Sequence, residues 1–381
     1  MIKHSVGLGI LLLFAALQTP VATAGNGGIE SPQEIGPWAV GRTTFGIVDP
    51  ARNDRPLLVD VWYPVDANDT GGVSLSEYDL VFATLQSAIA LHEPPVSTET
   101  VRPLIVFSHG SGGIRYQSFF LTEALASHGF IVVAPDHTGN TAADLVFGTA
   151  VPLQQSALDR PQDISFVITQ MLAKNADPDD AFAGTIDSTR IGVTGHSFGG
   201  FTSLAMASGY QAIPPDRRVA AIAPFAPASG VLGDIELASI GIPTLILGGT
   251  ADITTPIDPE STRPWSLLPA HPRFRVDILD GGHQSFSDIC VIADALLSTG
   301  IPPDVIDFLL GNVDEGCAPE LIAFEEAHRL SRLYVVAFLK RYVANELQYR
   351  RFLNSGYANS HDLPVDFFQG TANGQPGENT P

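Results

Sequence analysis

From Pro103 onward, short runs of apolar residues alternate with segments whose apolar side chains recur every three to four positions. The runs "PLIVFSHG" and "FIVVAPDH" flank one such segment, "YQSFFLTEALASHG". Strands that are apolar throughout are typical of sheets covered on both faces, and their alternation with helices is typical of βαβ units. The pattern therefore predicts an α/β fold with a mostly parallel central sheet and helices on both faces.

The same alternation continues toward the C-terminus. Further strands are expected at "RIGVTG", "VAAIAPFAP", "IPTLILGGT" and "RFRVDILDGG", and further helices at 159–173, at 198–208 and over "FEEAHRLSRLYVVAFLKRYV". Before Pro103, "RTTFGIVD" and "LLVDVWYPV" flank the polar turn "PARNDRP", which predicts an N-terminal antiparallel hairpin. The run "YDLVFATLQSAIALH" is expected to form a short helix that covers the fold rather than extending its sheet.

Both ends of the chain differ in composition from this core. A basic start, an apolar run from Val6 to Leu17 and small residues at Ala22 and Ala24 predict a signal peptide cleaved after Ala24, and hence a secreted or periplasmic protein. A membrane anchor is disfavoured because the run is shorter than about 20 residues. The expected organisation is a signal peptide over 1–24, a flexible segment over 25–36, a single α/β domain that carries the site over 37–369, and a disordered tail over 370–381.

The chain is strongly acidic, with 41 Asp and Glu against 20 Lys and Arg and a net charge of −21. Removal of residues 1–24 takes away Lys3 and no acid, so 41 acidic and 19 basic side chains remain, a net charge of −22. Such a charge disfavours binding to nucleic acids and to anionic membrane surfaces. We therefore expect neither a nucleic-acid partner nor stable insertion into a membrane.

The chain has two cysteines, Cys290 and Cys317. In an exported protein this count favours one disulfide between them, and the alternative is a pair of buried free thiols. Two thiols without histidines at ligand spacing make a poor metal site. We expect a disulfide and no metal.

The stretch "RIGVTGHSFGGF" places Ser197 directly after a buried strand and before a helix rich in Gly and Ala. A bare G-x-S-x-G would occur by chance in roughly one in four or five such chains, so Ser197 could simply be a small residue in a turn. A nucleophile on a sharp strand-to-helix turn, however, needs small neighbours, and Gly195, Gly199 and Gly200 supply them. This context predicts that Ser197 is a nucleophile.

A serine hydroxyl needs a base to accept its proton, and the base needs an acid to orient it. In doubly wound sheets, functional groups gather where the strands end. Asp252 lies just beyond "TLILGGT", and His283 lies just beyond "VDILDGG". Because Ser, Asp, His is the order used by α/β-hydrolases, we predict a triad of Ser197, Asp252 and His283, with Asp258 as the alternative acid.

Acyl transfer also requires hydrogen-bond donors for the oxyanion. The backbone N–H of Phe198, directly after the nucleophile, is expected to be one donor. The loop "FSHGSGG" follows the third expected strand, and the amide of Ser111 within it is expected to be the second. A dinucleotide-phosphate turn is disfavoured because the third glycine of G-x-G-x-x-G would fall at Arg115.

The segments "FSHGSGGIRYQ", "LASHGFIVVAPDHTGNT", "GHSFGG", "GGTADITTP" and "GGHQSFSD" resemble the platelet-activating-factor acetylhydrolase and predicted dienelactone hydrolase group of the α/β-hydrolase superfamily. The resemblance runs from about Gly36 to about Val343. It implies the α/β-hydrolase fold, a triad at Ser197, Asp252 and His283, and no metal or organic cofactor. True dienelactone hydrolases use a cysteine nucleophile, so a serine here favours ordinary carboxylic esters over lactones.

These observations predict a secreted serine hydrolase that cleaves carboxylic esters with short acyl groups, without a cofactor. One alternative is a lipase-, cutinase- or polyesterase-like enzyme that acts on water-insoluble lipid or polymer esters. Another is a catalytically inactive binding protein built on the same fold.

Three segments, 66–100, 138–158 and 253–270, are expected to shape the pocket, with Trp265 and Phe286 as candidate wall residues. The insertion that follows Asp252 runs only from residue 253 to residue 272 and holds five prolines. A large mobile lid therefore has little room there.

Overall fold

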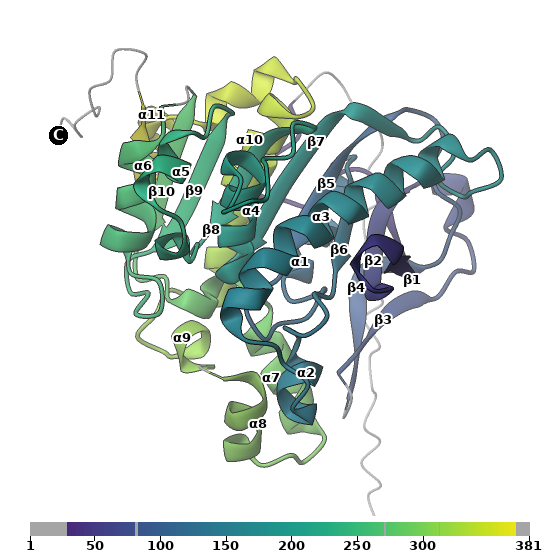
Figure 1. Ribbon diagram of the computed structural model, residues 1–381, viewed down its shortest axis with the longest axis horizontal. Coiled ribbons are helices and arrows are strands. Elements are labelled where there is room, and N and C mark those ends of the chain that lie inside the picture. The colour runs from purple at the N-terminus through teal and green to yellow at the C-terminus, as the bar shows by residue number, and fades with distance from the viewer. Residues whose placement is uncertain (1–28, 81–82, 270–271, 312, 371–381) are drawn as a thin grey trace, which may run out of the picture.

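The computed structural model describes residues 29–80, 83–269, 272–311 and 313–370, and within these ranges eleven strands form one mixed sheet (Figure 1). Their order across the sheet is β11-β10-β9-β8-β7-β5-β6-β2-β1-β4-β3. The strands are β1 (Ala39–Asp49), β2 (Arg55–Val65), β3 (Leu75–Asp79), β4 (Thr84–His92), β5 (Arg102–Ser108), β6 (Ile131–Pro135), β7 (Ile186–His196), β8 (Val219–Phe225), β9 (Thr244–Gly249), β10 (Arg273–Ile278) and β11 (Val365–Gln369).

The six strands from β10 to β6 run parallel, which confirms the predicted mostly parallel α/β-hydrolase sheet. The predicted N-terminal hairpin is β1 and β2, paired antiparallel over their whole length. β2 continues the sheet by pairing antiparallel with β6. At the other edge β11 pairs antiparallel with β10, an addition that the sequence pattern did not indicate.

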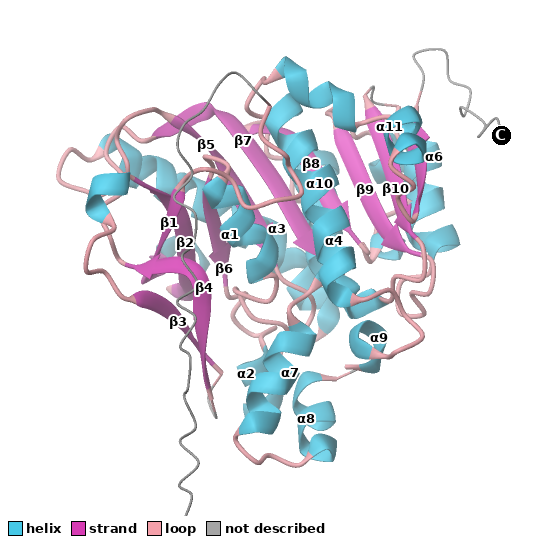
Figure 2. Ribbon diagram, turned by 180° about the vertical axis from the view of Figure 1, so that it is seen from behind, coloured by secondary structure: helices cyan, strands magenta, loops and turns pink. Residues whose placement is uncertain are grey.

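Helices cover both faces of the sheet (Figures 1 and 2). They are α1 (Phe119–Ser127), α2 (Ala142–Phe147), α3 (Leu153–Ala176), α4 (Phe198–Ser208), α5 (Asp234–Ala238), α6 (Arg263–Leu267), α7 (Ile289–Ser298), α8 (Pro303–Leu310), α9 (Asp314–Cys317), α10 (Phe324–Tyr342) and α11 (Ser355–Ser360). Side chains of α1 and α10 share one buried apolar cluster, and those of α3 to α6 share another. Successive residues of β5 belong to these two clusters in turn, as expected for a strand covered on both faces.

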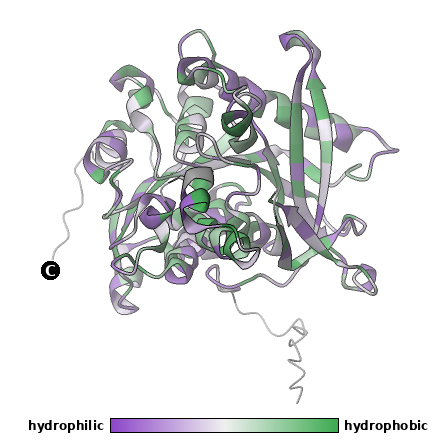
Figure 3. Cartoon of the chain, turned by 90° about the horizontal axis from the view of Figure 1, so that it is seen from below, coloured by the Kyte–Doolittle hydropathy of each residue, from purple (hydrophilic) through white to green (hydrophobic). Residues whose placement is uncertain are grey.

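The predicted short helix between β2 and β5 is wrong, because this segment forms β3 and β4. In the first part of β4 the inward positions are Leu85, Ser87 and Ile89, a period of two that the polar Ser87 conceals. Ser87 tolerates burial because its Oγ donates a hydrogen bond to Glu123 Oε1 at 2.6 Å. Figure 3 shows hydrophobic and hydrophilic residues interleaved at this end of the sheet.

Most residues at the two ends of the chain lie outside the described ranges. The predicted signal peptide and residues 371–381 of the predicted tail lie outside the described residues. Of the segment expected to be flexible, residues 29–36 are described, and they contact α1 and α10: Gly36 N–H donates to Ser127 Oγ at 2.8 Å, and Arg332 Nε donates to Gln33 O at 2.9 Å. No helix in the described ranges is long and apolar enough to cross a membrane.

Cys290 at the start of α7 and Cys317 at the end of α9 form a disulfide, which confirms the predicted pairing. The bridge spans 27 positions and encloses α8. The disulfide therefore joins the two ends of the segment 290–317, which follows His283 a few residues later in the chain.

Replacing both cysteines by serine is expected to lower the free energy of unfolding by about 3–4 kcal/mol, because the bridge restricts the unfolded chain. Urea unfolding of the parent and the double variant measures the difference. Thiol titration of the unfolded, unreduced parent should find almost no free thiol, and two reactive thiols per chain would contradict the bridge.

Candidate active site

The turn that carries Ser197 is the tightest feature of the site. β7 ends at His196 and α4 begins at Phe198, so Ser197 alone joins strand to helix, with φ 57° and ψ −117°. Only a strongly constrained backbone holds a non-glycine residue in this region. A Cβ on Gly195 would lie 2.5 Å from the carbonyl oxygen of Ser108, and a Cβ on Gly199 would overlap the same atom. The two glycines are therefore required for α4 and β5 to approach each other.

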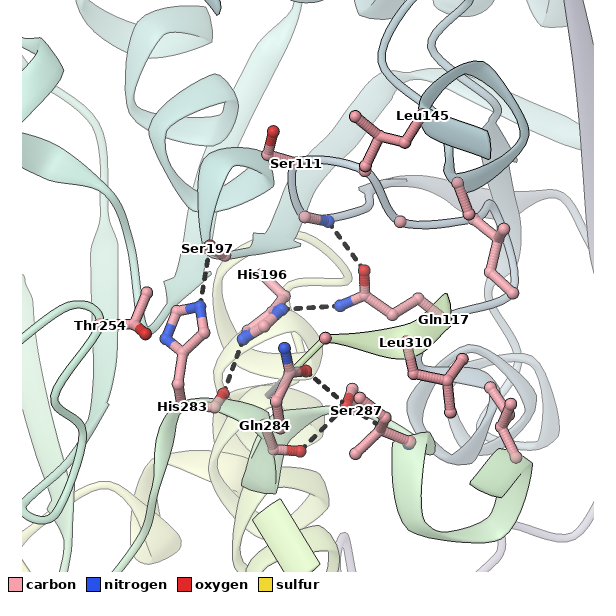
Figure 4. Close-up of a pocket in the computed structure, with 18 residues that line it drawn as sticks. Ser111, Gln117, Leu145, His196, Ser197, Thr254, His283, Gln284, Ser287 and Leu310 are labelled. Atoms are coloured by element: carbon pink, nitrogen blue, oxygen red, sulfur yellow. Dashed lines mark hydrogen bonds between the residues drawn. The ribbon is translucent and has the colours of Figure 1, made fainter. Parts of the chain in front are cut away.

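Ser197, His283 and Asp252 form a continuous hydrogen-bonded series. Ser197 Oγ lies 2.9 Å from His283 Nε2 (Figure 4). His283 Nδ1 lies 2.9 Å from Asp252 Oδ2. Because a carboxylate can only accept, Nδ1 carries the proton, which leaves Nε2 free to accept one from the serine. The three residues follow β7, β10 and β9, whose carboxyl ends meet at one edge of the sheet.

Asp252 is buried, and both of its carboxylate oxygens accept hydrogen bonds. Its carboxylate accepts from the amides of Thr254 and Thr255, at 2.9 and 2.6 Å, and from Thr255 Oγ1 at 2.7 Å. Burial alone would raise the pKa of Asp252, but the hydrogen bonds from His283 and Thr255 outweigh it and lower that pKa below its ordinary value. The alternative acid, Asp258, is exposed at the start of the turn Asp258–Thr262. The structure thus brings Asp252 to His283.

The loop after β5 lies beside the serine. The amide of Gly110 donates to Gln117 Oε1, that of Gly112 to Asn140 O, and that of Gly113 to Gly110 O. In the described part of the chain no acceptor is hydrogen-bonded to the Ser111 amide. Phe198 is the first residue of α4, where a helix has no internal acceptor for its amides. Both predicted oxyanion donors are therefore available.

A pocket of about 400 Å³ opens above Ser197 and His283. Its apolar wall consists of Ile114, Leu145, Ile289, Ile292 and Leu310. Of the segments expected to shape it, 138–158 contributes Ala142 and Leu145 and 253–270 contributes Thr254, whereas the described residues of 66–100 contribute none. Much of the wall comes from residues 284–311, including α7 and α8, which the sequence analysis did not consider.

Trp265 and Phe286 do not line this pocket, so their expected role as wall residues is corrected. Trp265 is buried on α6, its ring centroid 6.0 Å from that of Phe368. Phe286 is fully buried, 5.9 Å from the ring of Phe225. Large apolar side chains occur both in cores and in pocket walls, so their type alone does not tell which. Here both side chains pack in the core.

Gln117 and His196 were not among the predicted site residues, yet they connect its parts. Gln117 Nε2 lies 2.6 Å from His196 Nδ1, and His196 Nε2 lies 2.8 Å from the carbonyl oxygen of His283. Burial lowers the pKa of His196 to about 3, so it is neutral and donates through Nε2. In the sequence, the position of His196 directly before Ser197 was the one feature that could have pointed to it as a site residue. The described residues contain no cluster of three or more potential metal ligands.

Comparison with known proteins identifies a family, several relatives and a solved structure of similar fold. The family described as "PETase: PET hydrolase-like" matches residues 90–293, a range that includes Ser197, Asp252 and His283. Cutinase 2 of Thermobifida cellulosilytica is 27% identical over 252 residues, 66% of this chain and 72% of that protein. Cutinase cut1 of Thermobifida fusca is also 27% identical, and the match spans 60% of its length.

A platelet-activating factor acetylhydrolase of Cavia porcellus is 28% identical over 143 residues, 29% of this chain and 33% of its own. Among solved structures, the ferulic acid esterase from Streptomyces cinnamoneus superposes with a TM-score of 0.62 at 24% identity, covering 86% of this chain and 96% of that one. The last likeness concerns the fold alone.

Proposed function

Because this chain belongs to the PET hydrolase-like family of ester-cleaving α/β-hydrolases, we propose that it hydrolyses carboxylic esters of short acyl groups through an acyl-enzyme on Ser197. The observation that carries the proposal is the unbroken series from Asp252 through His283 to Ser197 at the base of an open pocket. A serine activated in this way attacks ester carbonyls.

In the proposed mechanism, His283 Nε2 takes the proton of Ser197 Oγ as that oxygen attacks the carbonyl carbon. The amides of Ser111 and Phe198 donate to the oxyanion of the tetrahedral intermediate. His283 then protonates the departing alcohol, which leaves the acyl group on Ser197. A water molecule, deprotonated by His283, then attacks the acyl carbon. The bond to Ser197 Oγ breaks, His283 returns the proton to that oxygen, and the acid is released.

We further propose that the protein is exported and acts outside the cytoplasm. The composition of residues 1–24 supports this, as does the Cys290–Cys317 disulfide, because such bridges persist in oxidising compartments.

A second candidate function, hydrolysis of water-insoluble esters, is favoured by exposed apolar side chains at the pocket. Leu145 lines the pocket with 59% of its surface exposed, and its neighbour on α2, Phe147, is 74% exposed. Ile253, beside Asp252, is 77% exposed. Such side chains suit contact with an apolar surface, and the relatives named above are called cutinases.

The resemblance to the acetylhydrolase group favours acyl groups of about two to six carbons. Turnover of soluble esters is expected to rise smoothly with their concentration. The physical reason is that Ser197 is only half-buried, so substrate reaches it without a lid having to open. The measurement follows one ester series across its solubility limits, as monomer and as emulsion.

Phe147→Ser is the matched variant for this experiment, since Phe147 lies outside the residues that line the pocket. We expect it to leave the turnover of soluble esters unchanged. A jump in rate when emulsion appears, lost in Phe147→Ser, would favour the second candidate instead, as would a preference for chains of about a dozen carbons or more.

A further inference from the structure

A buried arginine lies beneath the loop that carries the Ser111 amide. Arg160, on α3, is 0% exposed. Its Nη1 donates to the carbonyl oxygen of His109 at 2.6 Å, and its Nη2 donates to that of Gly110 at 2.8 Å. The rigid guanidinium fork thus holds two consecutive carbonyls of the loop in place.

The second of these carbonyls belongs to the peptide unit whose N–H is that of Ser111. His109 Nδ1 lies 2.7 Å from the Gly110 oxygen, and the Gly113 N–H also donates to it at 3.2 Å, so this carbonyl accepts from three groups. Hydrogen bonds that draw electron density toward a carbonyl oxygen make the N–H of the same peptide unit a stronger donor. Arg160 is therefore placed to fix the direction of the Ser111 N–H and to strengthen it.

Arg160 also contacts the other proposed donor residue. Its Cζ lies 5.0 Å from the centroid of the Phe198 ring, a cation–π distance. Its Nε donates to Asn140 Oδ1 at 3.0 Å, and Asn140 Nδ2 in turn donates to Ser111 Oγ at 3.1 Å. One side chain thus reaches both sides of the proposed oxyanion site.

No carboxylate neutralises this arginine by direct contact: none of the ion pairs within the described ranges includes Arg160. The nearby Asp163 is held instead by Arg55 and by His137 Nδ1, at 2.8 and 2.9 Å. Burial lowers the pKa of Arg160 to about 9, which still leaves it charged at neutral pH. A buried, unpaired charge is costly, and here its field lies under the site where negative charge would develop.

The end of β5, from which the loop begins, is fixed by a second hydrogen-bonded series. Ser108 Oγ lies 2.9 Å from His137 Nε2, and His137 Nδ1 contacts Asp163. All three side chains are fully buried, so this series cannot meet a substrate. It anchors the strand end against which Arg160 holds the loop.

We propose that Arg160 is a positioning residue of the oxyanion site, which orients and polarises the Gly110–Ser111 peptide and adds a fixed positive charge behind it. The inference rests on the proposed function, because it assumes that an oxyanion forms beside Ser197. It predicts that Arg160 stabilises the tetrahedral intermediate more than the bound ester.

The test compares Arg160→Met and Arg160→Lys with the parent, using a soluble p-nitrophenyl butyrate assay and competition by phenylboronic acid. Phenylboronic acid forms a tetrahedral adduct with an activated serine, whereas an unreactive ether analogue of the ester reports binding of the ground state. In Arg160→Met we expect kcat to fall about 10- to 100-fold, with KM within about 3-fold of the parent. Boronate affinity should fall in parallel while ether affinity is retained.

Arg160→Lys keeps the charge and most of the volume but cannot donate to both carbonyls in the fixed fork. Arg160→Lys should lose less kcat and less boronate affinity than Arg160→Met, with ether affinity again retained. If Arg160→Met fails to fold, the kinetics of Arg160→Lys alone test the inference. The matched control is Arg218→Met. Arg218 also hydrogen-bonds to α3, through Ser165 O, but within the described ranges its side chain donates to Asp216, Thr169 and Ser165 and not to the loop that carries Ser111. Thermal unfolding of each variant establishes that it is folded.

Folded Arg160 variants with the kcat and boronate affinity of Arg218→Met would overturn the inference. Equal losses of boronate and ether affinity would also overturn it, because they indicate a general structural role. If the parent protein showed no ester hydrolysis, or hydrolysis that Ser197→Ala did not abolish, the proposed function itself would be contradicted.

Discussion

Replacing Ser197 by alanine is expected to lower kcat on the order of 10⁴-fold or more and to leave the fold intact. The hydroxyl is the atom proposed to attack the ester, and its hydrogen bond runs to His283 Nε2. Alanine fits the same space and meets the same backbone demand at φ 57°. Initial rates on a soluble ester, with thermal unfolding of both proteins, measure the two effects separately.

Labelling by a fluorophosphonate is the companion measurement, because it requires an activated serine. The parent should be labelled on Ser197 and the alanine variant should not. A parent that binds esters but takes no label would support the alternative of an inactive binding protein. Comparable turnover in pure parent and pure Ser197→Ala would remove Ser197 from the mechanism, and His283→Ala should lose nearly as much activity as Ser197→Ala.

Asp252→Asn is expected to lower kcat about 10³- to 10⁴-fold, somewhat less than the loss of the nucleophile. The carboxylate holds the proton on His283 Nδ1 at 2.9 Å, whereas an asparagine amide can itself donate to that nitrogen and so favour the wrong tautomer. Thr254 and Thr255 donate to Asp252, so the substitution also disturbs the loop that supports it. Kinetics of the purified, folded variant give the result.

The matched control is Asp258→Asn, at an exposed carboxylate in the same loop. Its rate should stay within about 2-fold of the parent. If Asp258→Asn proved the more damaging of the two changes, the acid of the triad would have to be moved to that residue.

The residues proposed for the chemistry could be located from sequence because each follows its own buried strand. The rule that parallel strands present their carboxyl ends at one edge needs only the chain order of strand and loop. Ser197, Asp252 and His283 obey it, and the structure places them 2.9 Å apart in series. The two cysteines could be paired because no third cysteine competes.

The wall of the pocket could not be predicted, because it depends on packing between distant segments. Trp265 and Phe286 are large aromatic residues of the kind that lines pockets, yet both are buried in the core of the protein. The helices α7 and α8 carry apolar side chains whose purpose emerges only where they meet Leu145 around the pocket. Likewise, the polar Ser87 conceals the period of two in β4 until its buried partner Glu123 is known.

The backbone of Ser197 has a consequence for how the sequence can change over time. A non-glycine residue with positive φ costs on the order of 1–3 kcal/mol, which the surrounding fold must offset. Glycine would relieve that cost, so selection for stability and selection for activity favour different residues at this one position. A descendant that no longer used the hydroxyl would gain stability by accepting glycine there. The serine is retained only while the reaction is.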